Sequence, residues 1–517
     1  MKKYRYVSWS CVWSVMALLL VATSGMAQDL NTPAAFELMK ERNLWRQSEN
    51  AAGLLLDNPY RYSELKAGYN WSKGNFCRPQ QGNGNHDLDF GTEGGVFLKK
   101  MYVWGAFDYS RESLKNVDFK QSIIDPYRGM PYYVTDLNTS DWENQFYDMR
   151  FKVSLPVNQM WSLGLDGKYS VAQGAKQRDI RTTNLYYRLD VKPAVVYSFN
   201  DSHHVGLVLE YMNLKEEANP DMANTDDYQP YYELYGLGTA SENVGSGKTV
   251  NYIGNRVGAG LQYGYQEGAV KLLLTGDYSY RVEDAEFSFD RPEKFGTAKE
   301  KLWQGKLLFQ LWSASYSHHF EASYRNSGID GIQYVQQNTS SEGWQTLHSN
   351  IRSTYKTQLA GLDYSLIANR GNEYRWRLGV GVQYDNEKDE YLIPYSVKRT
   401  ENLAFSVNGK VNIALSDRLA ERLLIAAKVM YSNNLSGCYS YNGSYPDYAV
   451  VTDFEQTDLN YLVSDFYGLN ESVTYSRKIK PSQPANLYVK GMVDYRKTND
   501  FDFSDRTTIS FALGCNF

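Results

Sequence analysis

The chain has 517 residues, of which 42% are hydrophobic and 15% aromatic, with 44 Tyr, 40 Gly and a formal net charge of −5. Its mean hydropathy is −0.54, and its only long apolar stretch is close to the N-terminus. These values exclude a helical membrane protein of this size, which would need several apolar stretches of about 20 residues. They leave a soluble protein or a β-barrel, whose membrane strands alternate in polarity and stay hydrophilic on average.

Residues 1–27 are typical of a secretory signal peptide. Lys2, Lys3 and Arg5 precede an apolar stretch over 12–22, and small residues stand near the end of this region. About a dozen apolar residues is short for a membrane span, so we expect cleavage before Gln28. Residues 28–59 then form a periplasmic N-terminal segment, in which Thr32 can cap a helix that Pro33 begins. We expect this segment to be either a small plug inside a barrel or a tail resting on its rim.

From residue 60 to residue 517, the chain repeats stretches in which apolar and polar residues alternate. Clear examples lie at 161–171, 257–265, 270–281, 376–385 and 403–413. Spans of about 10 to 14 residues are long for globular strands but fit tilted membrane strands. Short connections such as 99–100 alternate strictly with long ones, including 216–249, 284–299 and 327–345. The pattern predicts an all-β protein, a transmembrane antiparallel up-and-down β-barrel of roughly 18 strands in a Gram-negative outer membrane, with both termini periplasmic.

The last twelve residues form the clearest strand of this kind. Ile509, Phe511, Leu513 and Phe517 share one face, and small or polar residues such as Ser510 share the other. This end resembles the closing strand of bacterial outer-membrane barrels. We therefore expect it to complete the barrel, to contact outer-membrane lipid and lipopolysaccharide, and to be recognised by the barrel assembly machinery.

Three features together resemble an uncharacterised family of outer-membrane β-barrel proteins of Bacteroidota. They are the prelude Trp45…Ser48…Asn50-Ala51-Ala52-Gly53, the Tyr-rich strands and the terminal Phe517. The resemblance covers the whole mature chain. It implies the fold and the location, and it implies no particular activity.

Inward strand positions carry more basic than acidic residues. The candidate basic lumen face comprises Lys168, Arg256, Lys271, Arg281, Arg375, Arg377, Lys410, Lys428, Lys490 and Arg496. A ring of like charge in a pore attracts counter-ions. We therefore expect a channel or solute-uptake protein that favours small anionic or polar solutes. The alternative is that these side chains pair with lumenal acids or plug residues and only solvate the interior.

The long loops are acidic and rich in Tyr. The candidate outer-loop recognition residues are Tyr228, Tyr231, Tyr232, Tyr235, Tyr439, Tyr441 and Tyr445. Aromatic rings beside Asp and Asn suit a glycan or protein partner. In the alternative, the loops pack on one another over the barrel mouth. The protein would then be a plugged structural or surface-binding barrel, or an accessory to an uptake or secretion complex.

No residue set indicates catalysis. The pairs at 203–204 and 318–319 each place one His on each face of a strand, and no acid pair can be placed beside His86 or His348. We expect no enzymatic activity, no metal, no cofactor and no nucleic-acid partner. Cys77 and Cys438 both fall in predicted outer loops, so the sequence leaves open whether they pair.

Overall fold

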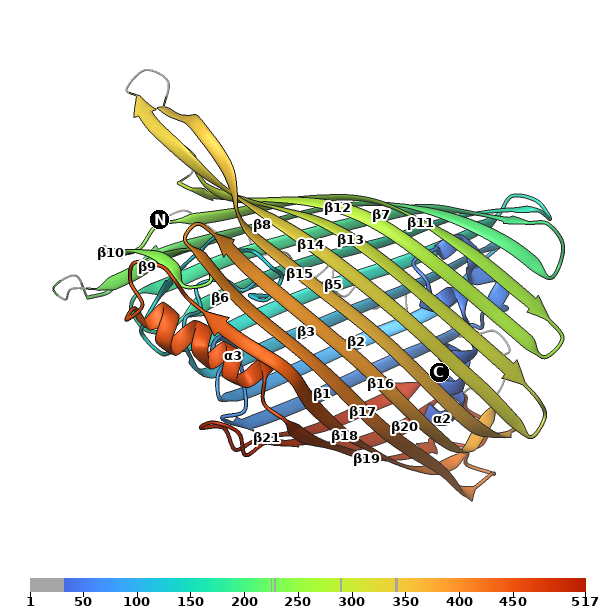
Figure 1. Cartoon of the computed structure of the whole chain (residues 1–517). Helices are drawn as coiled ribbons and strands as arrows, with labels where there is room; N and C mark the ends of the chain where they lie inside the picture. Colours follow the sequence, from blue (N-terminus) through green and yellow to red (C-terminus); the bar gives the residue numbers. More distant parts are fainter. Residues whose placement is uncertain (1–31, 225, 227–228, 289–290, 340–342) are drawn as a thin grey trace, which may run out of the picture.

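The computed structural model describes residues 32–224, 226, 229–288, 291–339 and 343–517. Its main element is an antiparallel sheet of 18 strands that closes on itself (Figure 1). The barrel strands are β1 (Tyr62–Gly74), β2 (Gly84–Leu98), β3 (Met101–Val117), β5 (Ser140–Pro156), β6 (Trp161–Lys176), β7 (Arg181–Ser198), β8 (His203–Asp221), β11 (Val250–Glu267), β12 (Val270–Phe287), β13 (Glu293–Trp312), β14 (Tyr316–Thr339), β15 (Gly343–Arg370), β16 (Glu373–Leu392), β17 (Tyr395–Ser416), β18 (Glu421–Ser440), β19 (Phe466–Lys478), β20 (Asn486–Lys497) and β21 (Asp505–Asn516). The predicted fold class is confirmed.

Pairing between the last and the first strand closes the barrel. β21 pairs with β1 from Arg506 opposite Gly74 to Asn516 opposite Glu64. Beyond this ladder, the Phe517 N–H donates to the carbonyl of Ser63 at 2.9 Å. Closure satisfies the backbone groups of both edge strands, which is what a sheet needs in lipid, where no water can replace a missing partner.

The outer surface of the barrel is an apolar belt. Outward side chains such as Leu261, Phe511 and Leu513 are 63%, 61% and 62% exposed, whereas their strand neighbours face the interior. At one edge of this belt, the rings of Trp161 and Tyr197 lie with their centroids 4.7 Å apart. An apolar belt edged by aromatic rings around a polar interior is the architecture of outer-membrane barrels. None of the helices in the described ranges is both long and apolar enough to cross a membrane.

The two ends of the barrel differ, and we call them the turn end and the loop end. At the turn end, strands are joined by short connections such as 99–100, 268–269 and 371–372, and β21 ends there. The loop end carries the segments 118–139, 222–249 and 441–465. These contain the remaining elements, namely a three-stranded sheet of β4 (Tyr133–Asp136), β9 (Pro230–Gly236) and β10 (Thr239–Val244), the π-helix η4 (Val450–Glu455) and the helix α3 (Gln456–Leu462). The short helix η3 (Pro79–Gln81) lies between β1 and β2.

The predicted strict alternation of short and long connections is wrong at the loop end. Only Ile393 and Pro394 separate β16 from β17. The ranges 284–299 and 327–345, expected as loops, are mostly strand, because the backbone pairing of β12 to β15 continues after the outward apolar residues end. As a result, β14 and β15 project from the barrel as a long hairpin (Figure 1).

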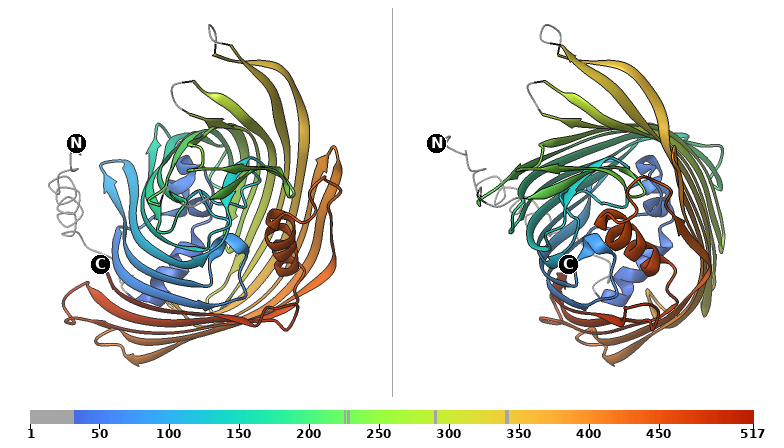
Figure 2. Two further views of the ribbon diagram at one scale, coloured as in Figure 1. Left: turned by 90° about the vertical axis from the view of Figure 1, so that its left-hand side faces the viewer. Right: turned by 60° about the vertical axis from the view of Figure 1, so that its left-hand side comes forward.

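The N-terminal segment lies inside the ring of strands (Figure 2). It comprises the helix α2 (Pro33–Arg42) and the 3-10 helices η1 (Trp45–Gln47) and η2 (Ala51–Asp57). η2 packs against β5, β6 and β7, and α2 packs against β16. We call residues 32–58 the inner segment. The predicted signal peptide at 1–27 lies outside the described residues.

Candidate functional site

Helix α2 begins as its sequence predicts, with Thr32 as the cap and Pro33 in the first turn. The Ala35 N–H donates to Thr32 Oγ1 at 3.2 Å, and Thr32 Oγ1 donates to the carboxylate of Glu373 on β16. One face of α2 packs on a small apolar patch of the barrel wall that contains Ile367, Tyr374 and Leu424. The cap therefore does two things: it begins the helix and fixes it to the wall.

The prelude residues hold the rest of the inner segment. Asn50 caps η2, because the Ala52 N–H donates to its Oδ1 at 3.0 Å. Its amide group donates to Gln262 Oε1 on β11 at 2.8 Å. The ring of Trp45 is buried against an apolar part of the wall formed by Ala194, Val196, Val208, Leu273 and Leu308. An added Cβ on Gly53 would come within 2.1 Å of that ring, so only glycine allows this close approach.

Carboxylates of the inner segment pair with basic residues of the wall. The pairs are Glu37–Lys410 at 3.0 Å, Glu41–Arg377, and Glu49–Lys192 at 2.7 Å. Two further lysines reach backbone carbonyls of the segment: Lys152 donates to Ser48 at 2.8 Å and Lys271 to Arg42 at 3.3 Å. Two basic residues of the inner segment, Lys40 and Arg46, form ion pairs with an acid of the wall, Glu93 on β2. The segment thus covers five bases of the wall and brings its own acids to three of them.

The predicted basic lumen residues fall into four groups. Arg377, Lys410 and Lys271 contact the inner segment, as described above. A second group pairs with acids of the wall, through Lys168–Asp148 at 3.2 Å, Arg256–Glu300 at 3.3 Å, Arg281–Glu283 at 2.9 Å and Arg496–Asp494 at 3.3 Å. Lys428 and Lys490 have no acid within 4.0 Å in the described part of the chain. Arg375 is the extra residue of a β-bulge on β16 and is exposed.

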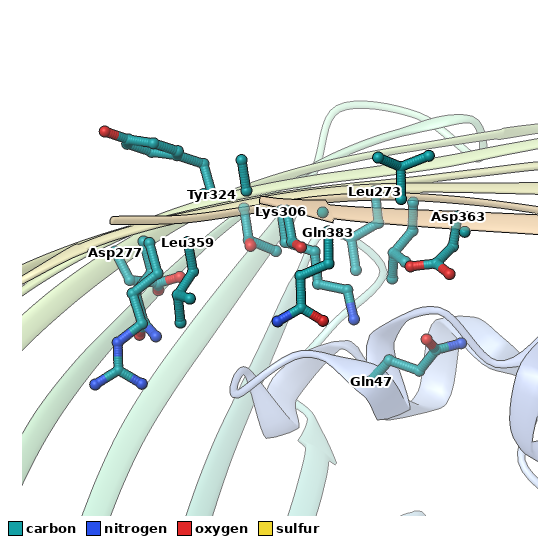
Figure 3. A pocket seen from close by; sticks show the side chains of 18 of the residues that line it. Gln47, Leu273, Asp277, Lys306, Tyr324, Leu359, Asp363 and Gln383 are labelled. Atoms are coloured by element: carbon teal, nitrogen blue, oxygen red, sulfur yellow. The ribbon is translucent and has the colours of Figure 1, made fainter. Parts of the chain in front are cut away.

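A cavity of about 480 Å³ lies between the inner segment and the wall, and we call it the chamber. Gln47, Ser48 and Glu49 of the inner segment line one side of it. Figure 3 shows Lys306 and Gln383 projecting from the wall between Asp277 and Asp363, while Tyr324 points away. Two further cavities, of about 700 and 190 Å³, continue toward the loop end. Arg325 on β14 lines all three.

Buried charges hold the loop end together. Arg78 makes two hydrogen bonds to the carboxylate of Asp458 on α3, at 2.6 and 2.9 Å. Lys398 on β17 donates to Asp458 at 2.9 Å and to Glu455 at 2.6 Å. Burial works against the charge of Asp458, but Lys398 and Arg78 outweigh it and lower its pKa to about 2. We call Arg78, Lys398, Glu455 and Asp458 the latch, because they join three loop-end elements.

The Tyr residues proposed for outer-loop recognition are mostly packed inside the loop layer. Tyr231 and Tyr232 are buried, and Tyr235, Tyr439 and Tyr441 pack against the same apolar clusters. Tyr445 is 53% exposed, and its ring stacks on Tyr448 with centroids 4.7 Å apart. Tyr228 lies outside the described residues. This packing is the arrangement expected if the loops cover the barrel mouth.

The His side chains of each predicted pair make different contacts. His204 faces inward and bonds Ser198 at 2.8 Å, whereas His203 and His318 meet the Tyr263 and Tyr364 hydroxyls. The described residues include no cluster of His, Cys, Asp and Glu that could hold a metal ion. Cys77 and Cys438 are both free thiols.

Two parts of the site were missed by reading the sequence. The first is the identity of Glu37, Glu41 and Glu49 as partners of wall bases. The sequence allows for plug partners in general, but no local pattern links residues more than 100 positions apart. The second is Arg325. It follows the outward Tyr324, so strand alternation alone places it inside the barrel.

Comparisons with known proteins give a family and a set of distant barrels. A family model described as "Family of unknown function (DUF6850)" matches residues 51–517. No curated protein matches the chain. Similar solved structures include the ferric yersiniabactin uptake receptor FyuA from Yersinia pestis, at 7% identity over 88% of this chain and 80% of that chain, with a TM-score of 0.43. The outer membrane transporter YddB from Escherichia coli is 8% identical over 88% of this chain and 81% of that chain, with a TM-score of 0.41. BauA, the ferric preacinetobactin receptor from Acinetobacter baumannii, is 8% identical over 88% of this chain and 80% of that chain, with a TM-score of 0.39.

Proposed function

This chain belongs to the family of unknown function DUF6850, and from that premise we propose that it is a gated solute-uptake barrel of a Gram-negative outer membrane. Residues 28–59 are its plug, and both termini are periplasmic. At rest, the inner segment blocks the turn end and the loop layer covers the other end. When the plug leaves, a polar or anionic solute passes.

The connection of the inner segment to the barrel supports a gate. Along the chain, the inner segment connects to the first barrel strand, β1, through residues 59–61. Its own residues, 32–58, take part in no strand pairing of the sheet. It can therefore move without opening the β-ladder. Its charged contacts are partly open to water, and such ion pairs contribute only about 0–1 kcal/mol each. The ion pairs therefore contribute little to holding the plug, and its departure has to overcome mainly the burial of apolar residues such as Trp45 and Leu54.

The charges that the plug covers support a preference for anions. Wall bases in contact with it are Lys152, Lys192, Lys271, Arg377 and Lys410. Wall acids that pair with its own bases are Glu64 and Glu93. Lys152 and Lys192 also pair with the wall acids Asp166 and Glu210. Departure of the plug would therefore free three bases, Lys271, Arg377 and Lys410, against two acids, which is a small excess of positive charge that attracts anions. The cross-pairing of plug carboxylates with wall bases is the observation that carries the proposal.

Planar-bilayer recording tests this function. We expect the full-length barrel to conduct rarely, and a variant lacking residues 32–58 to conduct steadily with anions favoured over cations. Heat-dependent gel mobility serves as the control that the shortened barrel is folded. A folded variant that stays closed, or that favours cations, would contradict the gate or the anion preference respectively.

A second candidate is a surface-binding barrel, and the stacked pair Tyr445 and Tyr448 favours it. The exposed Tyr445 ring stacks on the partly buried Tyr448, so its outer face is a flat apolar platform, which suits a sugar or a protein side chain. A glycan array with the intact barrel, compared with a Tyr445→Ala variant, tests this candidate. Binding that survives the substitution would count against the platform.

A further inference from the structure

Only some of the charged residues that line the chamber have an ion-pair partner. Lys306 pairs with Glu321 at 2.7 Å, and Glu49 with Lys192 at 2.7 Å. The remaining charged groups have no opposite charge within 4.0 Å in the described part of the chain; they are Asp277, Arg325, Asp363 and Lys428. The chamber therefore offers a solute groups of both signs that have no direct ion-pair partner.

Asp277 and Arg325 stand in one row across three neighbouring strands. Asp277 on β12 is opposite Gln304 on β13, and Gln304 is opposite Arg325 on β14. Two strand spacings place their α-carbons about 10 Å apart. Asp277 leans the other way, since an added Cβ on Gly260 of β11 would come within 1.9 Å of its Oδ1. The missing side chain at Gly260 thus keeps this acid apart from the guanidinium.

We propose that the chamber binds a zwitterionic solute with the chemistry of a short peptide with free ends. Its ammonium group lies at Asp277, its carboxylate lies at Arg325, and Gln304 meets the polar groups between them. This inference rests on the proposed function for the route by which the solute enters. The recognition itself rests on the chamber alone.

The rest of the lining favours a peptide over a sugar. The aromatic side chains that border the chamber, Tyr324 and Phe405, are each 48% exposed on the outer face of the barrel. Among the described lining residues, therefore, no ring is placed to stack on a sugar, as sugar sites usually require. Gln47, Gln304 and Gln383 supply both donors and acceptors, which suits the N–H and C=O groups of a peptide bond.

If Asp277 binds the ammonium group and Arg325 the carboxylate, then blocking either end of a dipeptide should weaken its binding. Isothermal titration calorimetry of the full-length barrel in detergent would use alanyl-alanine, its N-acetyl form, its C-terminal amide and sucrose. We expect the free dipeptide to bind about tenfold more tightly than either capped form, because each cap removes one charged hydrogen bond. Sucrose should bind most weakly.

Variants then assign each end of the solute. Asp277→Asn should abolish the preference for the free amine and keep the preference for the free carboxylate. Arg325→Gln should do the reverse. Asp494→Asn, on β20 and outside the chamber lining, should change neither. A general loss of folding would lower all affinities together and would not produce this crossed pattern.

Three results would overturn the proposal. They are equal binding of all four probes, tighter binding of sucrose, or no heat from any probe at about 10 mM. Failure of the gate is distinguishable from failure of the site. A barrel that opens without its plug but gives a flat probe series refutes the zwitterion site alone. A crossed pattern in a barrel that never conducts refutes the gate alone.

Discussion

Two glycines decide how closely the inner segment approaches its neighbours. Gly53 lies against the Trp45 ring, and Gly164 on β6 lies against the backbone of η2. An added Cβ on Gly164 would come within 2.1 Å of the Ala52 nitrogen. A ring can rotate away from a clash, but a backbone nitrogen moves only with its helix. Gly164 is therefore the residue at which the barrel wall itself limits the position of the segment.

Replacing Gly164 with alanine should loosen the inner segment without harming the barrel. Overpacking of this kind costs about 1–3 kcal/mol, and displacement of η2 is the easiest way to relieve it. Trypsin should then cleave after Arg42 and Arg46 in the folded protein faster than in the parent. The matched control is Gly276→Ala on β12, where an added Cβ meets no atom within 4 Å. Equal cleavage of the two variants would contradict the contact.

At the scale of elements, the latch explains why the loop end stays closed. Asp458 on helix α3 pairs with Arg78, which precedes η3, and with Lys398 near the start of β17. These ion pairs connect the three elements. The side chains of Asp458 and Lys398 are 4% and 10% exposed, so their attraction is weakly screened. Removing one partner of such a buried group leaves an uncompensated charge, which costs more than the intact pair contributes.

Asp458→Asn should release η4 and α3 from the barrel mouth. The loss of one buried partner costs about 3 kcal/mol, or a roughly hundredfold faster local opening. Hydrogen exchange of the amides at 450–462 measures it, with Asp453→Asn, at an exposed position of the preceding helix η4, as control. Unchanged exchange in Asp458→Asn would exclude the latch.

The same carboxylate gives the latch a definite pH range. The folded pKa of Asp458 is about 2, below the ordinary value of 3.8. A depressed pKa stabilises the folded state fully above the unfolded value, and this contribution is lost as the pH falls through the folded value. The parent should therefore keep slow exchange at 450–462 down to about pH 4 and lose it between pH 4 and 2.

Strands were predictable wherever lipid imposed an alternating outer face. The range 257–265 fell correctly inside β11, because its outward residues are apolar along the belt. The range 327–345 was expected as a loop, because the outward positions that follow Tyr324, namely Asn326, Gly328 and Asp330, are not apolar while backbone pairing continues. Bulges opposite Ile332 and Gln336 also shift the period of β15. Contact with lipid imposes the alternation of apolar and polar residues that predicts a strand, whereas backbone hydrogen bonding between strands imposes no such sequence pattern.

The inner site was less predictable, because its contacts are distant in sequence. Inward placement of Arg256, Lys410 and Asp277 follows from strand period, and the structure has these groups facing the lumen. Their partners do not follow from any period: Lys410 meets Glu37 across 373 positions. Asn50 gave a local signal as a cap, but its bond to Gln262 depends on where the segment docks.

For the whole molecule, both closures act on one continuous interior. The inner segment borders the chamber from the turn end, and the latch and loop layer border the larger cavity from the other. Arg325 faces both spaces. In the proposed gate, opening either closure alone would give the chamber access to one side only. Both closures depend on a barrel wall that keeps its shape.

The wall in turn depends on the strand that closes it. Phe511 is central in the outer face of β21, opposite Gly491 of β20 and Tyr69 of β1. Phe511→Arg should destabilise the barrel by roughly 2–4 kcal/mol, because it places a charge in lipid near the middle of the belt. Ser510→Arg, one residue away and facing the lumen, should cost much less. Urea unfolding of the two variants in lipid vesicles measures the difference. Equal destabilisation would mean that Phe511 does not face lipid, and the assignment of inner and outer faces along the closing strand would then be reversed or lost.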